Sequence, residues 1–250
     1  MISCLAESKE WDKEFQNKEP FDHIVIDNFL DLSFANLLKD NFPTPNQQKW
    51  WSYDNPLEKK LAFNDLTKLD DSFTRFFNEI NSEPFVKWLS FISGLDLQAD
   101  ESLNGGGLHL IKRGGKLDVH EDYNIHKGLG MLRSLNLILY LNENWDESWG
   151  GHLELWNSDM TKLCEKITPS FNRAVIFRTD MKSNHGHPHP LTCPEDRFRM
   201  SLACYYYRKV ENIESIEYKS TSYKKLPNVE DGLDELREIR RKGRIKDEVK

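Results

Sequence analysis

The chain of 250 residues has an ordinary composition for a folded protein, with 38% hydrophobic and 30% charged residues. This length is enough for one domain with a sizeable core, and the composition excludes a disordered chain. The net charge of −7 argues against nucleic acid as a partner. No apolar run is long enough to span a membrane, so we expect no membrane partner.

The first residues, Met1 to Glu7, have no basic start and no long apolar stretch, so we expect no secretory signal. Four cysteines, at positions 4, 164, 193 and 204, lack the Cys-x-x-Cys spacing. We therefore expect reduced thiols and a cytoplasmic protein, with a disulfide pair as the alternative. Because there are no repeats and no low-complexity linker, we expect a single domain over 1–250.

The first elements expected are a strand and a short helix. Residues 21–30 are rich in β-branched side chains, which favours a strand. A short helix is expected over 34–38. The segment that follows is expected to be a loop, and for its aromatic rings packing is favoured over lining a substrate entrance; these rings are Trp50, Trp51 and Tyr53.

Two further helices are predicted by aromatic and aliphatic residues at helical spacing. They cover 73–80 and 85–92, and Gly94 is well placed to end the second. We expect their apolar stripes to pack against a sheet.

From Gly105 onward the sequence changes to short strands separated by glycines. In 132–141 the four leucines at odd positions face one side, whereas Asn136, Ile138 and Tyr140 face the other. Many short strands with glycine turns and no interleaved helices indicate a barrel or a sandwich. The expected strands are 108–112, 117–122, 132–141, 152–156, 173–177 and 199–207.

The segment 209–250 is strongly charged and is expected to extend a core of about 21–208. Acidic residues in 230–235 precede basic residues in 237–242. This order suits a helix macrodipole, so we expect a C-terminal helix of three or four turns.

His120 and Asp122 are the first candidates for chemistry. Residues two apart on an extended strand point to the same side, so the two side chains converge. They would supply two members of a 2-His-1-carboxylate set, which leaves coordination positions open and suits non-haem Fe(II). The third member is left open by three alternating histidines, His185, His187 and His189.

These residues belong to an ordered series that also includes Arg133, the run Tyr140-Leu141-Asn142, Gly150-Gly151 and the pair Arg199-x-Ser201. Over roughly 105–207 the series resembles the iron(II)- and 2-oxoglutarate-dependent dioxygenases, in particular the prolyl-4-hydroxylase-like branch. The resemblance implies a mainly β fold with flanking helices around a double-stranded β-helix, a jelly-roll and cupin-like core.

The resemblance also implies a role for each candidate. Fe(II) would be held by His120, Asp122 and His185, because Ser183-x-His-Gly matches the family's distal histidine; His187 is the reserve.

Arg199 would bind the distal carboxylate of 2-oxoglutarate through two parallel hydrogen bonds. Hydroxyl groups of Ser201 and Tyr140 would assist, with core packing as the alternative role of Tyr140. One position departs from the family: Ile111 stands where many relatives carry a tyrosine, nine residues before the first iron histidine. His109, of the same strand parity, is a candidate for a polar role there.

The implied activity is hydroxylation of an unidentified small-molecule or peptidyl substrate, coupled to oxidative decarboxylation of 2-oxoglutarate to succinate and CO2. O2 is the oxidant and ascorbate a candidate reductant; the cofactors supply the chemistry and the protein the geometry. The carboxylate of Asp122 favours hydroxylation over halogenation. The alternative is a non-catalytic cupin-like metal-binding module, which leaves Arg199 and Tyr140 without purpose. A metal-dependent hydrolase on the same fold is a weaker one. The sequence does not indicate an oligomeric state.

Overall fold

The computed structural model describes residues 2, 10–180 and 182–243. Cys4 and nearly all of the segment expected to hold no signal lie outside this part. The α-helices are α1 (Trp11–Phe15), α2 (Leu32–Asp40), α3 (Asp71–Ile80), α4 (Glu83–Ser93) and α5 (Asp234–Lys242). Short 3-10 helices cover Leu66–Lys68, Glu147–Trp149 and Ile213–Ser215.

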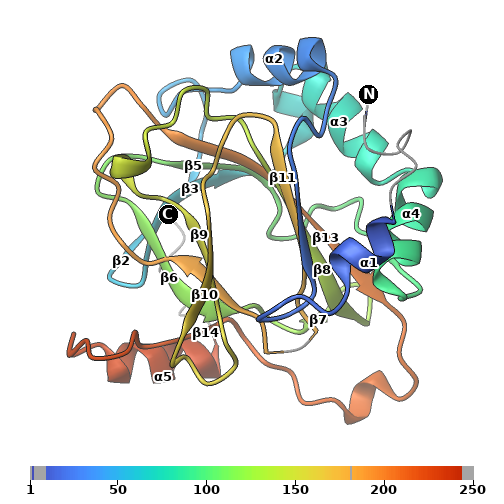
Figure 1. Ribbon diagram of the computed structural model, residues 1–250, viewed down its shortest axis with the longest axis vertical. Coiled ribbons are helices and arrows are strands. Elements are labelled where there is room, and N and C mark those ends of the chain that lie inside the picture. The colour runs from blue at the N-terminus through green and yellow to red at the C-terminus, as the bar shows by residue number, and fades with distance from the viewer. Residues whose placement is uncertain (1, 3–9, 181, 244–250) are drawn as a thin grey trace.

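The strands form one curled antiparallel sheet with the order β1-β11-β8-β13-β5-β3-β6-β12-β9-β10, to which β2, β4, β7 and β14 add at the edges of β3, β13, β8 and β6. Figure 1 shows the sheet wrapped around a central axis. The strands are β1 (His23–Ile26), β2 (Trp51–Asn55), β3 (Glu58–Phe63), β4 (Gln98–Ala99), β5 (Gly107–Ile111), β6 (Lys116–Glu121), β7 (Ile125–His126), β8 (Met131–Tyr140), β9 (Leu153–Trp156), β10 (Leu163–Ile167), β11 (Arg173–Arg178), β12 (Asn184–His187), β13 (Arg199–Arg208) and β14 (Ser222–Tyr223).

The alternation along β8 divides the inside of the sheet from its outside. Leu135, Leu137 and Leu139 belong to the main hydrophobic core. Asn136 and Ile138, of opposite parity, line an interior cavity. The predicted fold class, a double-stranded β-helix with flanking helices, is confirmed.

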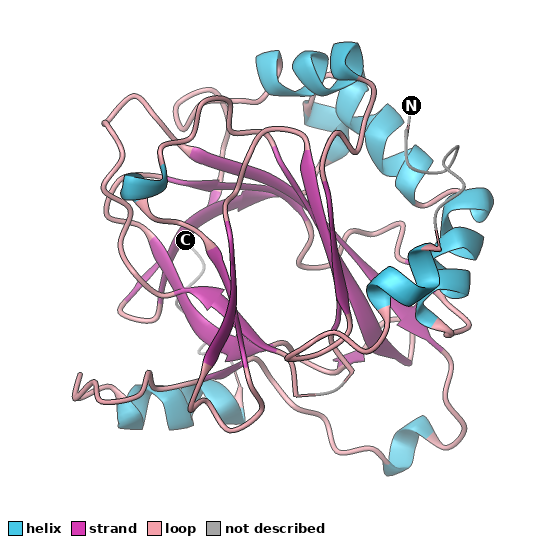
Figure 2. Cartoon of the chain, in the orientation of Figure 1, coloured by secondary structure: helices cyan, strands magenta, loops and turns pink. Residues whose placement is uncertain are grey.

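Helices α1 to α4 lie together along one side of the barrel, whereas α5 lies apart from them beside β14 (Figures 1 and 2). The aromatic stripe of α3 is buried in the main core through Phe73, Phe76 and Phe77. Gly94 ends α4 in the left-handed conformation, at a φ of 68°, which glycine adopts without steric cost. Both expectations for these two helices are confirmed.

Two segments that are absent from the expected strands form strands in the structure. Trp51 and Tyr53 lie on the hairpin β2–β3, whose turn lacks the Asn-Gly or Gly-Gly signal of a tight hairpin. Trp50, which directly precedes β2, packs between Phe42 and Phe63, whereas Trp51 on β2 is 52% exposed. The histidine run after residue 183 is strand β12, hidden in the sequence because histidine and glycine are poor strand signals.

The charged C-terminal segment folds back onto the barrel. β14 pairs antiparallel with β6, and α5 is nine residues long, shorter than the expected three to four turns. The cysteines within the described residues, at 164, 193 and 204, are free thiols. No helix of this described part is long and apolar enough to cross a membrane.

Candidate active site

Strands β6 and β12 bring His120, Asp122 and His185 together. His120 and His185 are directly paired across the two strands, and Asp122 follows β6. His120 Nε2 lies 3.5 Å from one carboxylate oxygen of Asp122, and His185 Nε2 lies 3.6 Å from the other. One donor atom from each of the three lies within 4.8 Å of the others, the arrangement of a metal site.

Gly186 allows the two strands to lie this close. A Cβ at this position would stand 2.8 Å from both the Leu117 carbonyl oxygen and the Val119 Cα, closer than real Cβ contacts. A larger residue would therefore force β12 away from β6. The distance between His120 and His185 thus depends on this glycine.

Each imidazole of the cluster is oriented by its own backbone. Nδ1 of His120 lies 2.8 Å from the Asp118 carbonyl oxygen, and Nδ1 of His185 lies 2.8 Å from that of Ser183. A carbonyl can only accept, so each Nδ1 carries the proton and each Nε2 presents its lone pair towards Asp122. Metal-binding histidines are commonly held in this way. Two imidazole nitrogens and one carboxylate, with coordination positions left open, fit Fe(II).

Arg133 neutralises the carboxylate of Asp122. Its Nη2 donates a hydrogen bond of 2.7 Å to Asp122 Oδ2, and its guanidinium stacks 3.5 Å from the centre of the Tyr205 ring. Burial by itself raises the pKa of Asp122, but Arg133 and the imidazoles of His185 and His120 lower it well below its usual range. The carboxylate is therefore ionised and ready to bind a cation.

Arg199 lies on β13 in the same cavity and is 5% exposed. Its Nε donates to the Gly151 carbonyl oxygen at 2.7 Å, and its Nη2 donates to the Tyr140 hydroxyl at 3.2 Å. No carboxylate of the described residues forms an ion pair with it, and burial lowers the pKa of Arg199. Ser201 pairs in register with Tyr140 and lines the cavity. A buried cation without an anion marks a place for an anionic ligand.

The metal cluster and Arg199 share one interior cavity of about 100 Å³. Ile111 contributes an apolar wall, so no hydroxyl replaces the family's tyrosine at this position. His109 also lines the cavity, and burial together with the charges of Lys60 and Arg199 lowers its pKa to about 3. His187 lines it as well and lies outside the metal cluster.

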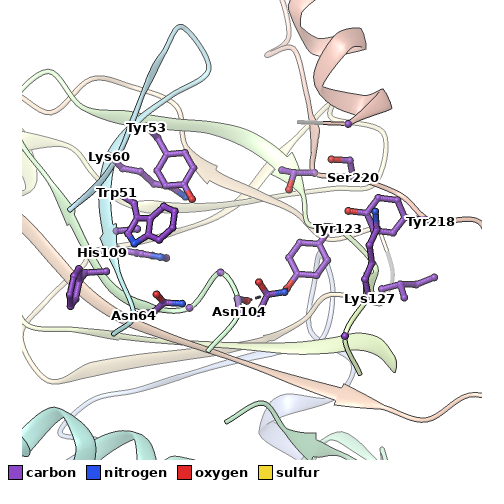
Figure 3. A pocket seen from close by; sticks show the side chains of 18 of the residues that line it. Trp51, Tyr53, Lys60, Asn64, Asn104, His109, Tyr123, Lys127, Tyr218 and Ser220 are labelled. Atoms are coloured by element: carbon purple, nitrogen blue, oxygen red, sulfur yellow. Dashed lines mark hydrogen bonds between the residues drawn. The ribbon is translucent and has the colours of Figure 1, made fainter. Parts of the chain in front are cut away.

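An entrance cleft of about 690 Å³, within the usual range of ligand sites, leads to this cavity. Figure 3 shows Trp51 and Tyr53 on one wall and Tyr218 on the opposite wall, with Tyr123 between them. Trp51 and Tyr218 are 52% and 43% exposed. The cleft and the cavity have lining residues in common, including Lys60 and His109, so the two spaces are continuous.

Three residues near the metal cluster were missed in the sequence. The Tyr223 ring lies 5.6 Å from the His120 ring, centre to centre. The guanidinium of Arg240, on α5, lies 5.6 Å from the centre of the Tyr223 ring. Arg240 also forms a buried ion pair with Glu58. Glu58 and Arg240 are 182 residues apart in the chain. No local pattern signals such contacts.

The fold and the donor set define a class of protein. The family model of the 2OG-Fe(II) oxygenase superfamily matches residues 106–207. Over these residues the chain is similar to this superfamily, and a prolyl hydroxylase among its relatives agrees with the branch that the resemblance in the sequence predicted.

Comparisons with individual proteins agree with the match to the family model. The mouse (Mus musculus) prolyl 3-hydroxylase OGFOD1 is 26% identical over 195 residues, which cover 76% of this chain and 33% of the mouse protein. The chain thus spans about a third of the length of this curated relative. The structure of a Pseudomonas putida prolyl-4-hydroxylase has a TM-score of 0.56 and 16% identity, covering 80% of this chain and 100% of that chain. A prolyl 4-hydroxylase from Phytophthora capsici has a TM-score of 0.53 and 23% identity, covering 94% and 72%. These two likenesses show the fold.

Proposed function

We propose that this chain is an Fe(II)- and 2-oxoglutarate-dependent dioxygenase that hydroxylates a prolyl residue of an extended peptide. In this reaction one oxygen atom of O2 enters the substrate C–H bond and the other enters succinate, and 2-oxoglutarate loses CO2. The observation that carries the proposal is Arg199, a buried cation without a carboxylate partner among the described residues, in the cavity that also holds the metal cluster.

In this proposal the metal ligands are His120, Asp122 and His185. Bound Fe(II) would supply the redox chemistry with O2. The protein's part is to hold the two Nε2 atoms and the carboxylate in place, through the backbone carbonyls and through Arg133.

Arg199 would bind the distal carboxylate of 2-oxoglutarate, with Tyr140 beside it. The Tyr140 hydroxyl accepts a hydrogen bond from Arg199 and so keeps its own proton to donate. Ser201, which lines the same cavity, would contribute its hydroxyl. Ascorbate is retained as a candidate reductant.

A peptidyl substrate is supported by the entrance cleft and by the mouse relative. The cleft has exposed aromatic rings on opposite walls, and aromatic-lined grooves suit extended proline-containing segments. The mouse relative is by name a prolyl 3-hydroxylase. We propose no nucleic-acid or membrane partner.

The domain division and the location of the protein are also proposals. We propose one domain over 1–250, with a core of about 21–208 and an extension of 209–250, supported by the pairing of β14 with β6. The free thiols at 164, 193 and 204 support a reducing compartment, the cytoplasm.

The test is formation of succinate from 2-oxoglutarate under air, with and without Fe(II) and with proline-containing peptides. We expect succinate only with Fe(II), stimulated by a peptide whose mass rises by one oxygen atom, derived from labelled O2. Arg199→Met should abolish this turnover. Arg197→Met is the matched control, because Arg197 lies two residues earlier and donates instead to the Glu143 carbonyl.

Other outcomes would contradict the proposal. A protein that binds Mn(II) under anaerobic conditions but neither binds nor consumes 2-oxoglutarate would be a cupin-like metal-binding module. Succinate formation stimulated by a small molecule and by none of the peptides would retain the dioxygenase and overturn the peptidyl substrate.

A further inference from the structure

His187 is a buried side chain without a hydrogen-bond partner among the described residues. It lies on β12, two residues after His185, and is 3% exposed. Neither ring nitrogen has a hydrogen-bond partner among the residues that the structure describes. Buried polar side chains nearly always have such a partner, so this imidazole is placed for a group that the described residues do not supply.

The position of His187 indicates which kind of group that is. It lines the interior cavity together with Arg199 and Ser201, and it is paired across the sheet with Leu117 of β6. The cations Arg199 and Lys60 line the same cavity. It is not part of the metal cluster formed by the described residues. An anion is the ligand that suits an N–H group beside two cations.

Arg199 by itself does not satisfy a carboxylate in this cavity. Its Nε is engaged by the Gly151 carbonyl and one N–H of Nη2 by the Tyr140 hydroxyl. A carboxylate has two oxygens with about four acceptor positions in total. Donors other than the free N–H groups of Arg199 are therefore needed; the Tyr140 and Ser201 hydroxyls are two of them, and His187 lines the same cavity as Ser201.

We propose that His187 is a binding residue for the distal carboxylate of 2-oxoglutarate, to which its ring N–H donates a hydrogen bond. This inference rests on the proposed function. It assigns a use to the second of the three alternating histidines, and it makes His187 a determinant of selectivity for a dicarboxylic over a monocarboxylic 2-oxo acid.

The experiment is anaerobic calorimetric titration of the Mn(II)-loaded full chain with 2-oxoglutarate and with 2-oxovalerate, which lacks the distal carboxylate. Weak binding of 2-oxovalerate is measured by competition against 2-oxoglutarate. A hydrogen bond to a charged group corresponds to about a tenfold to hundredfold change in affinity. His187→Leu should therefore weaken binding of 2-oxoglutarate by this factor and leave that of 2-oxovalerate unchanged within about twofold.

Two further variants distinguish the loss of a hydrogen bond from His187 from a change in the shape of the cavity. His187→Gln keeps a donor and should recover part of the affinity for 2-oxoglutarate. His189→Leu is the matched control in the same segment, because the His189 side chain is 72% exposed, and it should bind both acids like the wild type. The affinity for Mn(II) should be the same in all four proteins.

Three results would overturn the inference while leaving the proposed function in place. They are wild-type affinity of His187→Leu for 2-oxoglutarate, equal losses for the two acids, or a loss of Mn(II) binding in the leucine variant. If the wild type binds Mn(II) but not 2-oxoglutarate, the proposed function fails and the inference fails with it.

Discussion

Two buried arginines that line one cavity differ in the charge of the groups to which they donate. Arg133 is 1% exposed and donates to the carboxylate of Asp122. Arg199 is nearly as buried, but its partners are the neutral Gly151 carbonyl and Tyr140 hydroxyl. A buried ion pair is largely compensated, whereas a buried unpaired charge is costly until an anion arrives. Arg133 therefore compensates a charge within the chain, whereas Arg199 is the arginine that we propose to bind an anionic ligand.

Loss of a metal ligand should have the largest effect. We expect His120→Ala or His185→Ala to abolish stoichiometric Mn(II) binding in calorimetric titrations while leaving the fold intact, because each removes one of three converging donors. His189→Ala should bind normally. Stoichiometric binding by His120→Ala would refute the ligand assignment.

Replacing each arginine by methionine should show that Arg133 contributes mainly to the free energy of unfolding and Arg199 mainly to the affinity for 2-oxoglutarate. Arg133→Met leaves the Asp122 carboxylate buried and unpaired, so the free energy of unfolding of the metal-free protein should fall by about 3–5 kcal/mol. Arg199→Met should change it by less than about 2 kcal/mol, since two hydrogen bonds are lost but an unpaired charge is removed. Its affinity for 2-oxoglutarate should fall at least about 30-fold.

Denaturant titration and anaerobic calorimetry measure these two quantities. Arg199→Lys should recover only part of the affinity, because an ammonium group cannot form two parallel hydrogen bonds. The comparison fails if both methionine variants are destabilised equally, or if Arg199→Met binds 2-oxoglutarate like the wild type.

Acid should lower the free energy of unfolding of the protein through His109, which lines the cavity. Below pH 6.5 an unfolded imidazole takes up a proton, whereas the folded one stays neutral until its pKa of about 3. The unfolded state then binds more protons, so the free energy of unfolding falls as the pH is lowered, by up to about 1.4 kcal/mol per pH unit for this group. His109→Gln should fall less steeply in metal-free denaturation measured from pH 7 to pH 5. Identical slopes for the two proteins would show that His109 titrates normally.

The smallest effect is expected from Tyr223. Its ring contacts His120, and aromatic contacts contribute about 0.5–1.5 kcal/mol, so Tyr223→Leu should weaken Mn(II) binding by about twofold to tenfold. Tyr218→Leu, in the entrance cleft, should leave Mn(II) binding unchanged. Equal affinities of the two variants would mean that the C-terminal segment does not position His120.

Local alternation of residue types in the sequence predicts which side chains of a regular strand face the site. The leucines of 132–141 indicate which face of β8 is internal, and this places Tyr140 on the cavity side. The hairpin β2–β3 and strand β12 were not predicted, because their turns and residue types lack the usual strand signals. The contacts of Tyr223 and Arg240 depend on packing between distant segments, and the missing partner of His187 becomes visible only once its burial is known.

The pair formed by Glu58 and Arg240 has a consequence for synthesis of the chain. A ribosome makes Glu58 early and Arg240 182 residues later, after both metal-binding strands. Until α5 emerges, Glu58 lacks Arg240, and of its two ion-pair partners among the described residues only Lys60, whose Nζ lies 3.6 Å from Glu58 Oε2, has been synthesised. The part of the cavity wall that Glu58 and Tyr223 form beside His120 therefore gains its last buried contact only when α5 has been synthesised.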